Sequence, residues 1–349
     1  MPDYTIDVQG MVDFLTALLN IPSPTGYHEA AIEACENSFS NLPLALHRSR
    51  KGVLIGTWEG HEGSAPRGLT AHIDTLGAMV DTIKKDGRLK LTQLGGWAWG
   101  SVEGEGVTIM TQSGQTYRGT ILPTKASVHI YGADARDFKR DSDHYEVRLD
   151  IRADDAEEVC ILGISVGDFV AFDPRIEIGK AGFIRSRHLD DKAGVACIYG
   201  AVKALADAGL VPAQRAIVHI SNYEEVGHGG AAGFPPDMAE LLTIDMAAAG
   251  GPQNSDEFSV GICVKDAGGP YHIEMKRRLV ALAEAADIPY RLDVYPYYGS
   301  DGEAYWRSGG DVTVGLIGPG VDASHHYERT HVDSLEATAR LIAEYLLAE

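Results

Sequence analysis

The sequence predicts an α/β fold, in which a mostly parallel sheet flanked by helices carries an inserted, small β-barrel-like domain. Apolar runs of strand length alternate with amphipathic helical segments near both ends of the chain, which is the pattern of a parallel sheet covered by helices. Short alternating runs, broken by Gly, Asp and Ser, fill the middle of the chain without a long helix between them. That second pattern is typical of small barrels and sandwiches.

The changes of pattern place the boundaries. We expect a first part of the α/β domain at 1–79, an inserted β domain at 80–177 and a second part of the α/β domain at 178–349. The first part begins with two amphipathic helices, the earlier one ended by the turn IPSPTG, and continues with two strands. The expected ranges are 12–19 and 29–39 for the helices and 53–58 and 68–73 for the strands.

The inserted domain is predicted from segments in which apolar and polar residues alternate, as they do in half-buried strands. One short helix, at 156–162, fits between them. The expected strands are 106–111, 116–121, 127–131, 145–151 and 168–172.

The second part of the α/β domain starts with a helix rich in Ala and Val that ends at Gly209, where glycine is a common helix terminator. Strands and helices then alternate to the end of the chain. The expected helices are 192–208, 271–286, 302–308 and 335–347, and the expected strands are 216–221, 241–244, 261–264, 290–295 and 311–317.

The composition restricts the classes of partner. The formal charge is −20, from 50 acidic residues against 30 Lys and Arg, which argues against nucleic acid and against an anionic membrane surface. No apolar run is long enough to span a membrane, and the first residues do not resemble a secretory signal. The four cysteines form no CxxC pair, so we expect neither a disulfide framework nor a cysteine-type zinc site. The expected location is the cytoplasm.

Adjacent carboxylates at Glu224 and Glu225, between a β-rich run and a Gly-rich turn, are the most informative feature of the chain. Two acids at the end of a buried strand repel each other unless a positive charge holds them. Further acids and histidines also follow apolar runs, where sites form in open α/β sheets. The candidates for binding a metal are His72, Asp74, Asp190, Asp191, Asp245 and His331.

This set of residue types suits a site for two metal ions. Two zinc-like ions about 3.5–4 Å apart share one bridging carboxylate and one bridging water. The protein then has to supply one shared Asp, two His and two further acids as ligands. A sixth group takes the proton from the bridging water, and a Glu can act as this general base. The neighbours Glu224 and Glu225 would supply base and ligand from one turn.

Each candidate also has a purely structural interpretation. Glu224 and Glu225 are compatible with a solvated turn, and Asp190 with Asp191 is compatible with the start of a helix, where Asp is favoured. His331 is compatible with a surface residue at a helix start.

Seven strings, in one order, carry a resemblance to a known family. The chain resembles the TET-type metallo-aminopeptidases, peptidase family M42, within the dimetal aminopeptidase clan. The match covers most of the chain, from about residue 70 to residue 337. The strings are AHIDTLG, LGGWAWGSVEGEGVTIMTQSG, GISVGDFVAFD, RHLDDKAGVA, YEEVGHGGA, YGSDGEAY and ERTHVDSLEA.

The resemblance implies a role for each candidate. His72, Asp190 and Asp245 would hold one metal ion, while Asp190, Glu225 and His331 would hold the other. Glu224 would be the general base, Asp74 would orient His72, and the peptide bond after Asp190 would be cis. The C-terminal string GVDASHHYERTH differs from the usual family string, and His325 and His326 remain rivals of His331 as the last ligand.

The implied function is that of a dinuclear-metal aminopeptidase, which removes N-terminal residues from short peptides. The implied cofactors are two divalent ions per chain, with zinc as the first expectation and cobalt or manganese as alternatives. The inserted domain would be the dimerisation domain, and the dimers would assemble into a homo-oligomeric dodecamer. Two rival functions stay open: an amide hydrolase or deacylase specialised for a blocked or modified small peptide, and an oligomeric scaffold with a vestigial site.

Overall fold

The computed structural model describes residues 3–349. The chain forms two compact units. The larger consists of Met1–Asp74 together with Arg175–Glu349, and the smaller of Thr75–Pro174. Among residues 3–349, no helix has the length and the apolar character needed to cross a membrane.

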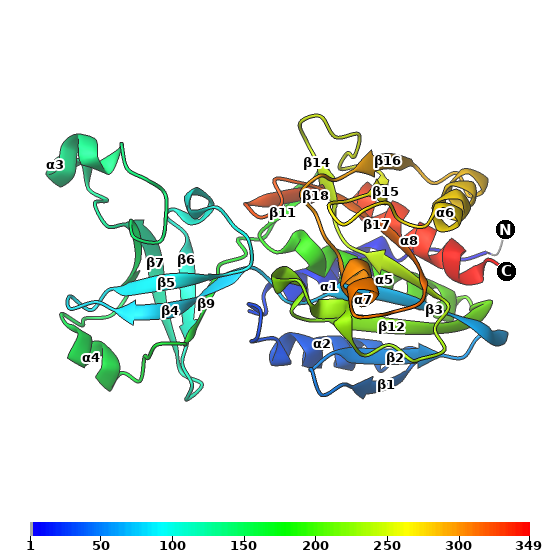
Figure 1. Ribbon diagram of the computed structural model, residues 1–349, viewed down its shortest axis with the longest axis horizontal. Helices are drawn as coiled ribbons and strands as arrows, with labels where there is room; N and C mark the ends of the chain where they lie inside the picture. The colour runs from blue at the N-terminus through cyan, green and yellow to red at the C-terminus, as the bar shows by residue number, and fades with distance from the viewer. Residues whose placement is uncertain (1–2) are drawn as a thin grey trace. The chain divides into compact units, whose positions relative to one another are not determined.

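The larger unit is built on a mixed sheet of twelve strands (Figure 1). In chain order these strands are β1 (Ala45–Arg48), β2 (Leu54–Trp58), β3 (Glu62–His72), β10 (Glu177–Ile178), β11 (Phe183–Ser186), β12 (Gln214–Ser221), β13 (Glu240–Ile244), β14 (Ala247–Ala249), β15 (Val260–Lys265), β16 (Tyr290–Val294), β17 (Thr313–Asp322) and β18 (Glu328–His331). The centre of the sheet has the order β12–β3–β13–β17 and is parallel throughout. Along the strand order from β12 to β1 and from β17 to β10 the pairing is antiparallel. The side strands β14 and β16 pair in parallel with β17 and β15. The expected parallel sheet is therefore confirmed for the centre.

Helices cover both faces of this sheet, as the alternation of its apolar side chains requires. Leu242 and Ile244 of β13 join the main core, to which the long helices contribute, whereas Leu241 joins a second core that includes residues of the short helix α7. The helices of this unit are α1 (Val8–Leu19), α2 (Glu29–Phe39), α5 (Leu189–Asp207), α6 (Ile273–Ala285), α7 (Asp301–Arg307) and α8 (Val332–Leu347).

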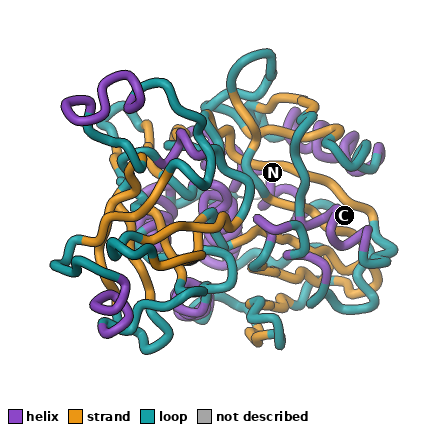
Figure 2. The backbone as a smooth tube through the Cα atoms, turned by 60° about the vertical axis from the view of Figure 1, so that its left-hand side comes forward, coloured by secondary structure: helices purple, strands orange, loops and turns teal. Residues whose placement is uncertain are grey.

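The smaller unit is a closed antiparallel barrel with the strand order β4–β5–β8–β7–β6–β9. Figure 2 shows that strands and loops make up most of this unit, whereas long helices belong to the larger one. Buried aromatic side chains, including Trp97, Trp99 and Tyr145, help to fill its core. Its elements are β4 (Gly77–Ile83), β5 (Leu89–Leu94), η1 (Trp99–Val102), β6 (Gly106–Met110), β7 (Thr116–Pro123), α3 (Val128–Tyr131), η2 (Gly132–Ala135), β8 (Tyr145–Leu149), α4 (Ala156–Ile161) and β9 (Phe169–Phe172).

One expected strand is wrong. Residues 127–131 form the short helix α3 instead. The β-branched and aromatic residues of this segment suggested a strand, but Val128 and Ile130 are exposed and do not pack into the barrel core. Gly132 follows with a φ of 57°, in the left-handed region, and ends the helix there. Strands β4 and β5, between 77 and 94, were not expected, because three lysines, two aspartates and two glycines interrupt their apolar pattern.

Candidate metal centre

The carboxyl ends of three neighbouring parallel strands meet at one edge of the larger sheet. His72 is the last residue of β3, Asp245 directly follows β13, and β12 leads into the turn that carries Glu224 and Glu225. The first turn of α5 adds Asp190. The structure therefore brings together five residues from distant parts of the sequence, at the edge where open α/β sheets bind their ligands.

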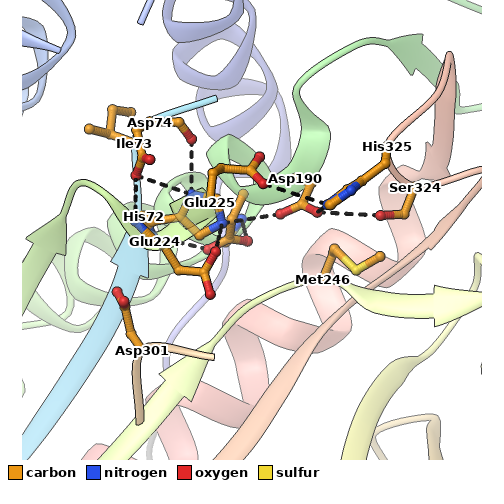
Figure 3. Close-up of polar contacts among 12 residues, drawn as sticks. His72, Ile73, Asp74, Asp190, Glu224, Glu225, Met246, Asp301, Ser324 and His325 are labelled. Carbon is orange, nitrogen blue, oxygen red and sulfur yellow. Dashed lines mark hydrogen bonds and ion pairs between the residues drawn. The ribbon is translucent and has the colours of Figure 1, made fainter. Parts of the chain in front are cut away.

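Asp190 is shared between two groups of candidate ligands (Figure 3). Ligand atoms of His72, Asp190 and Asp245 all lie within 4.8 Å of one another, and so do those of Asp190, Glu225 and His325. His72 Nε2 lies 3.1 Å from one carboxylate oxygen of Asp190, and His325 Nε2 lies 3.4 Å from the other oxygen. Imidazole nitrogens and carboxylate oxygens are donors that suit zinc, cobalt and manganese.

The electrostatics of the centre fit a divalent cation. Burial and the nearby charge of Asp190 raise the pKa of Glu225 well above its usual value. The same two causes raise the pKa of Asp245 to about 8. In addition, the Oε1 atom of Glu225 is buried without a hydrogen-bond partner. Because buried carboxylates need a counter-charge or a metal, these residues form a site that positive charge would stabilise.

His72 is oriented by its own strand end. Its Nδ1–H donates to the backbone carbonyl of Asp74 at 2.9 Å, so that Nε2 faces Asp190. The carboxylate of Asp74 lies 3.6 Å from Nδ1. It accepts closer hydrogen bonds, from Thr25 Oγ1 at 2.7 Å and from the backbone N–H of Glu224 at 3.1 Å. The backbone of Asp74 therefore orients the imidazole, and its side chain holds the turn of Glu224.

Asp191 connects the two sides of the centre. The peptide bond between Asp190 and Asp191 is cis, as the resemblance implied. The buried carboxylate of Asp191 accepts hydrogen bonds from the backbone N–H of His72 at 3.2 Å and from that of Gly194 at 3.1 Å. It thereby joins the end of β3 to the start of α5, and it is not a member of either ligand group.

Glu224 belongs to neither ligand group but lies beside His72, a member of the first group. Glu224 lies in residues 222–230, which we call the glutamate turn. One carboxylate oxygen of Glu224 is 3.7 Å from His72 Nε2. Burial raises the pKa of Glu224 well above its usual value, and the charge of Asp245 raises it further. A carboxylate with a raised pKa can take up a proton and give it back near neutral pH.

The structure places His331, the expected last ligand, outside both ligand groups. Both ring nitrogens of His331 are engaged elsewhere: Nδ1 accepts from the backbone N–H of Asp333 at 3.1 Å, and Nε2 donates to the carbonyl of Ala181 at 2.6 Å. The ring also packs against Phe183 and Phe258. His331 is thus the N-cap of α8, which is the structural interpretation weighed against the ligand role.

The loop between β17 and β18 contributes His325 to the second group of candidate ligands. Residues that were not recognised in the sequence hold this loop in place. His325 has a φ of 62°, a conformation that non-glycine residues adopt only under constraint. The buried carboxylate of Glu328 accepts from the backbone N–H of His325 at 3.1 Å and from that of Asp190 at 3.2 Å. Ser324 Oγ donates to Asp190 at 3.3 Å. His326, the other rival, is exposed.

Comparisons with known proteins agree with this architecture. The family model described as M42 glutamyl aminopeptidase matches residues 52–341. A Bacillus subtilis (strain 168) protein named "Putative aminopeptidase YhfE" is 48% identical over 339 residues, which cover 97% of this chain and 98% of that protein.

Two solved structures have the same fold. The aminopeptidase APDkam598 from Desulfurococcus kamchatkensis has a TM-score of 0.88 at 22% identity, covering 98% of this chain and 96% of that one. The Pyrococcus horikoshii TET1 peptidase, whose title says that it can assemble into a tetrahedron or a large octahedral shell, has a TM-score of 0.85 at 22% identity. That match covers 97% of this chain and 100% of the other.

Proposed function

The chain belongs to the M42 glutamyl aminopeptidase family and is an aminopeptidase, and on this premise we propose that it removes N-terminal residues from short peptides with two divalent metal ions bound around Asp190. His72 and Asp245 complete the ligand set of one ion, and Glu225 and His325 that of the other. The observation that carries this proposal is that one carboxylate, that of Asp190, belongs to two groups of converging ligand atoms.

Side chains around the metal ligands transfer the proton and position the base. Bound divalent ions polarise the scissile carbonyl and lower the pKa of a coordinated water. Glu224 takes the proton of the attacking water at a carboxylate oxygen and delivers it to the leaving amine. Its raised pKa supports this role, since an acid that is too strong would not hold the proton between the two transfers. The contact of Asp74 with the N–H of Glu224 keeps the base beside the ligands.

We assign zinc to the two positions as the first choice, with cobalt and manganese as alternatives. The ligand set of imidazole and carboxylate groups binds all three metals. Affinity alone does not select among them, so the metal bound in the cell depends on supply as well as on the ligands.

We also propose that the chain forms a homo-oligomer through its barrel unit, with dimers that build a dodecamer. The barrel presents large apolar side chains to solvent, and such exposure is typical of surfaces that bind another protein. The Pyrococcus horikoshii TET1 peptidase, which has the same fold, forms closed shells. The exposed side chains are Val128, Ile130, Tyr131, Ile161 and Val166.

The experiment combines metal analysis with turnover. The protein is stripped with a chelator, reloaded separately with Zn, Co or Mn, and given matched short peptides with free and with acylated N-termini. Two ions per chain and turnover of the free peptides alone support the proposal. Turnover of the acylated peptides alone would assign the site to a specialised deacylase, and a protein that binds no ion and hydrolyses neither would favour a scaffold.

A variant tests the sharing of Asp190 directly. Asp190→Ala is expected to lose both ions, because each ligand group loses its common member. Metal analysis of the purified variant gives the answer, and a variant that still binds two ions would show that Asp190 is not the bridge.

A further inference from the structure

The side chains of Lys51 and Asp301 hydrogen-bond to the glutamate turn from opposite sides. The peptide unit between Gly229 and Gly230 donates its N–H to Asp301 Oδ1 at 2.6 Å. The carbonyl of the same unit accepts a hydrogen bond from Lys51 Nζ at 2.9 Å. This peptide is trans, and in a trans peptide the N–H and C=O point in opposite directions. The two charged side chains therefore hold one peptide unit between them.

Asp301 forms the fixed side of this grip. It is the first residue of α7 and is buried, and it also accepts hydrogen bonds from Ser221 Oγ and Thr70 Oγ1. The turn lies directly on it: a Cβ atom at Gly229 would come within 2.3 Å of Asp301 Oδ1. Figure 3 shows Asp301 on the Glu224 side of the centre.

Lys51 forms the other side and comes from a distant part of the sequence. It lies in the connection between β1 and β2 and is only half buried. Its Nζ donates to the carbonyls of both His228 and Gly229, and it lies 5.6 Å from the ring centroid of Tyr223. The backbone carbonyl of Lys51 accepts a hydrogen bond from Asn222 Nδ2 at 3.1 Å. Lys51 therefore contacts both ends of the turn.

The backbone of the turn needs such support. Tyr223 has a φ of 65° and Gly227 one of 86°. A bulky side chain in the left-handed region is unfavourable, and it persists where the surroundings impose it. Within the turn, the N–H of Gly227 donates to the carbonyl of Glu224, the N–H of His228 donates to that of Tyr223, and the rings of Tyr223 and His228 stack. Lys51 and Asp301 hold the Gly229 end of the turn from outside, in addition to the contact of Asp74 with the N–H of Glu224.

We propose that Lys51 is a positioning residue, which with Asp301 fixes the glutamate turn and so holds Glu224 at the place where it moves the proton. This inference rests on the proposed role of Glu224 as general base. Lys51 does not touch the ligand groups in this arrangement. Its loss is expected to loosen the turn, so that the glutamate oxygens sample positions away from the reacting atoms, while the five ligands stay in place.

The test compares Lys51→Met with Lys51→Arg. Met keeps the length of the side chain without the donors, and Arg keeps a cation that can donate to both carbonyls. Lys180→Met, at an exposed turn, is the matched control. Each variant is measured for metal content, for kcat and KM on the free peptide that the wild type turns over best, and for hydrogen exchange of the segment 221–231. Hydrogen exchange is measured with and without metal, so it gives the mobility of the turn even when the enzyme is inactive.

We expect Lys51→Met to bind two ions and to keep its KM, while kcat falls about 10- to 100-fold, the order of loss caused by displacing a catalytic group by ~1 Å. Exchange in 221–231 should rise about tenfold or more, because a local opening becomes easier. Lys51→Arg should bring both kcat and the exchange rate closer to the wild type than Lys51→Met does, because the guanidinium keeps a positive charge and several donors for the two carbonyls. Lys180→Met should resemble the wild type.

Two results would overturn the proposal. A wild-type exchange rate together with a wild-type kcat in Lys51→Met would show that the hydrogen bonds from Lys51 are not needed to position the turn. A lower kcat with wild-type exchange and a shifted acidic limb of the pH profile would show that Lys51 acts through its charge and not by positioning. The proposed role of Glu224 can fail separately. Normal turnover in Glu224→Gln would show that Glu224 is not the general base, while the hydrogen-exchange result for Lys51→Met would still stand.

Discussion

Glu328 and His325 are joined by a hydrogen bond of 3.1 Å, from the backbone N–H of the histidine to one oxygen of the carboxylate. The second oxygen of Glu328 accepts from the backbone N–H of Asp190 at 3.2 Å. One buried carboxylate therefore fixes the main chain of two candidate ligands, Asp190 and His325. Groups that hydrogen-bond to metal ligands from behind orient those ligands and thereby tune the affinity for the metal.

Glu328→Gln is expected to weaken metal binding by about 10- to 100-fold, the range typical of lost outer contacts. The amide has one oxygen acceptor, so one of the two backbone N–H groups loses its partner. Competition with a chromophoric chelator measures the affinity. Glu336→Gln on α8 is the control, and equal affinities in the two variants would remove Glu328 from the support of the centre.

Glu224→Gln is expected to keep both ions and to lose at least about 10²- to 10⁴-fold in kcat, the usual contribution of a general base. The amide retains the shape of the side chain but cannot take up the proton. Metal analysis and turnover of the same preparation are needed, because a loss of metal would by itself abolish turnover. Near-normal kcat with two bound ions would contradict the assignment of the base.

His325→Ala and His331→Ala form a matched pair. The first removes a ligand and should lower the stoichiometry to one tightly bound ion, since His72, Asp190 and Asp245 remain. The second removes the N-cap of α8 and should keep both ions while lowering the free energy of unfolding by about 1 kcal/mol, as cap removal usually does. Metal analysis and urea unfolding separate the two effects, and the reverse pattern would restore His331 as the ligand.

The stability of the metal-free protein should fall as the pH rises. In the folded state burial raises the pKa of Asp245 from 3.8 to about 8 and that of Glu328 from 4.5 to about 8, in each case with help from Asp190. Below about pH 4 both states bind these protons, and between about pH 4 and pH 8 the unfolded state has released them while the folded state still holds them. The stabilisation present in acid is therefore lost as the pH approaches 8.

Added metal should change this dependence. Ligand groups must be deprotonated to bind, so zinc should raise Tm more at about pH 8 than at about pH 5. Thermal unfolding with chelator and with excess zinc at both pH values gives the comparison. An increase in Tm that does not depend on pH would argue against buried carboxylates as the ligands.

Much of the centre could be predicted from the sequence, because its residues directly follow recognisable strands. His72, Asp245 and the glutamate pair come after apolar runs that form β3, β13 and β12. Strand-end reasoning needs only the end of each run, and there the apolar pattern was clear. The helix of Asp190 was also recognisable, from the Ala-rich run that follows it.

His325 was not preferred over His331 in the sequence because the end of β17 was predicted wrongly. The strand was expected to stop at 317, before Gly318, Pro319 and Gly320, which resemble a turn. They lie inside β17, which runs to Asp322. A Cβ atom at Gly318 would come within 1.7 Å of the carbonyl oxygen of Asp245, so glycine serves close strand packing there. With the true end of the strand, the same reasoning would have pointed to the loop of His325.

The supporting contacts could not have been predicted in the same way. Lys51, Thr25 and Glu328 act on backbone groups or side chains that are distant in sequence, and no local pattern records which carbonyl or N–H lies nearby. Such contacts depend on how the loops pack, which follows from the fold as a whole.

The ends of the barrel unit lie next to each other, because its first strand, β4, pairs antiparallel with its last, β9, and Ala78 faces Val170. The chain thus leaves the larger unit just after Asp74 and re-enters it at Arg175 through two adjacent strands. For the α/β sheet, the whole barrel is topologically equivalent to a single surface loop. Evolution or an engineer can therefore lengthen, exchange or delete this module without changing the order of the strands that carry the ligands, as domain insertions generally allow.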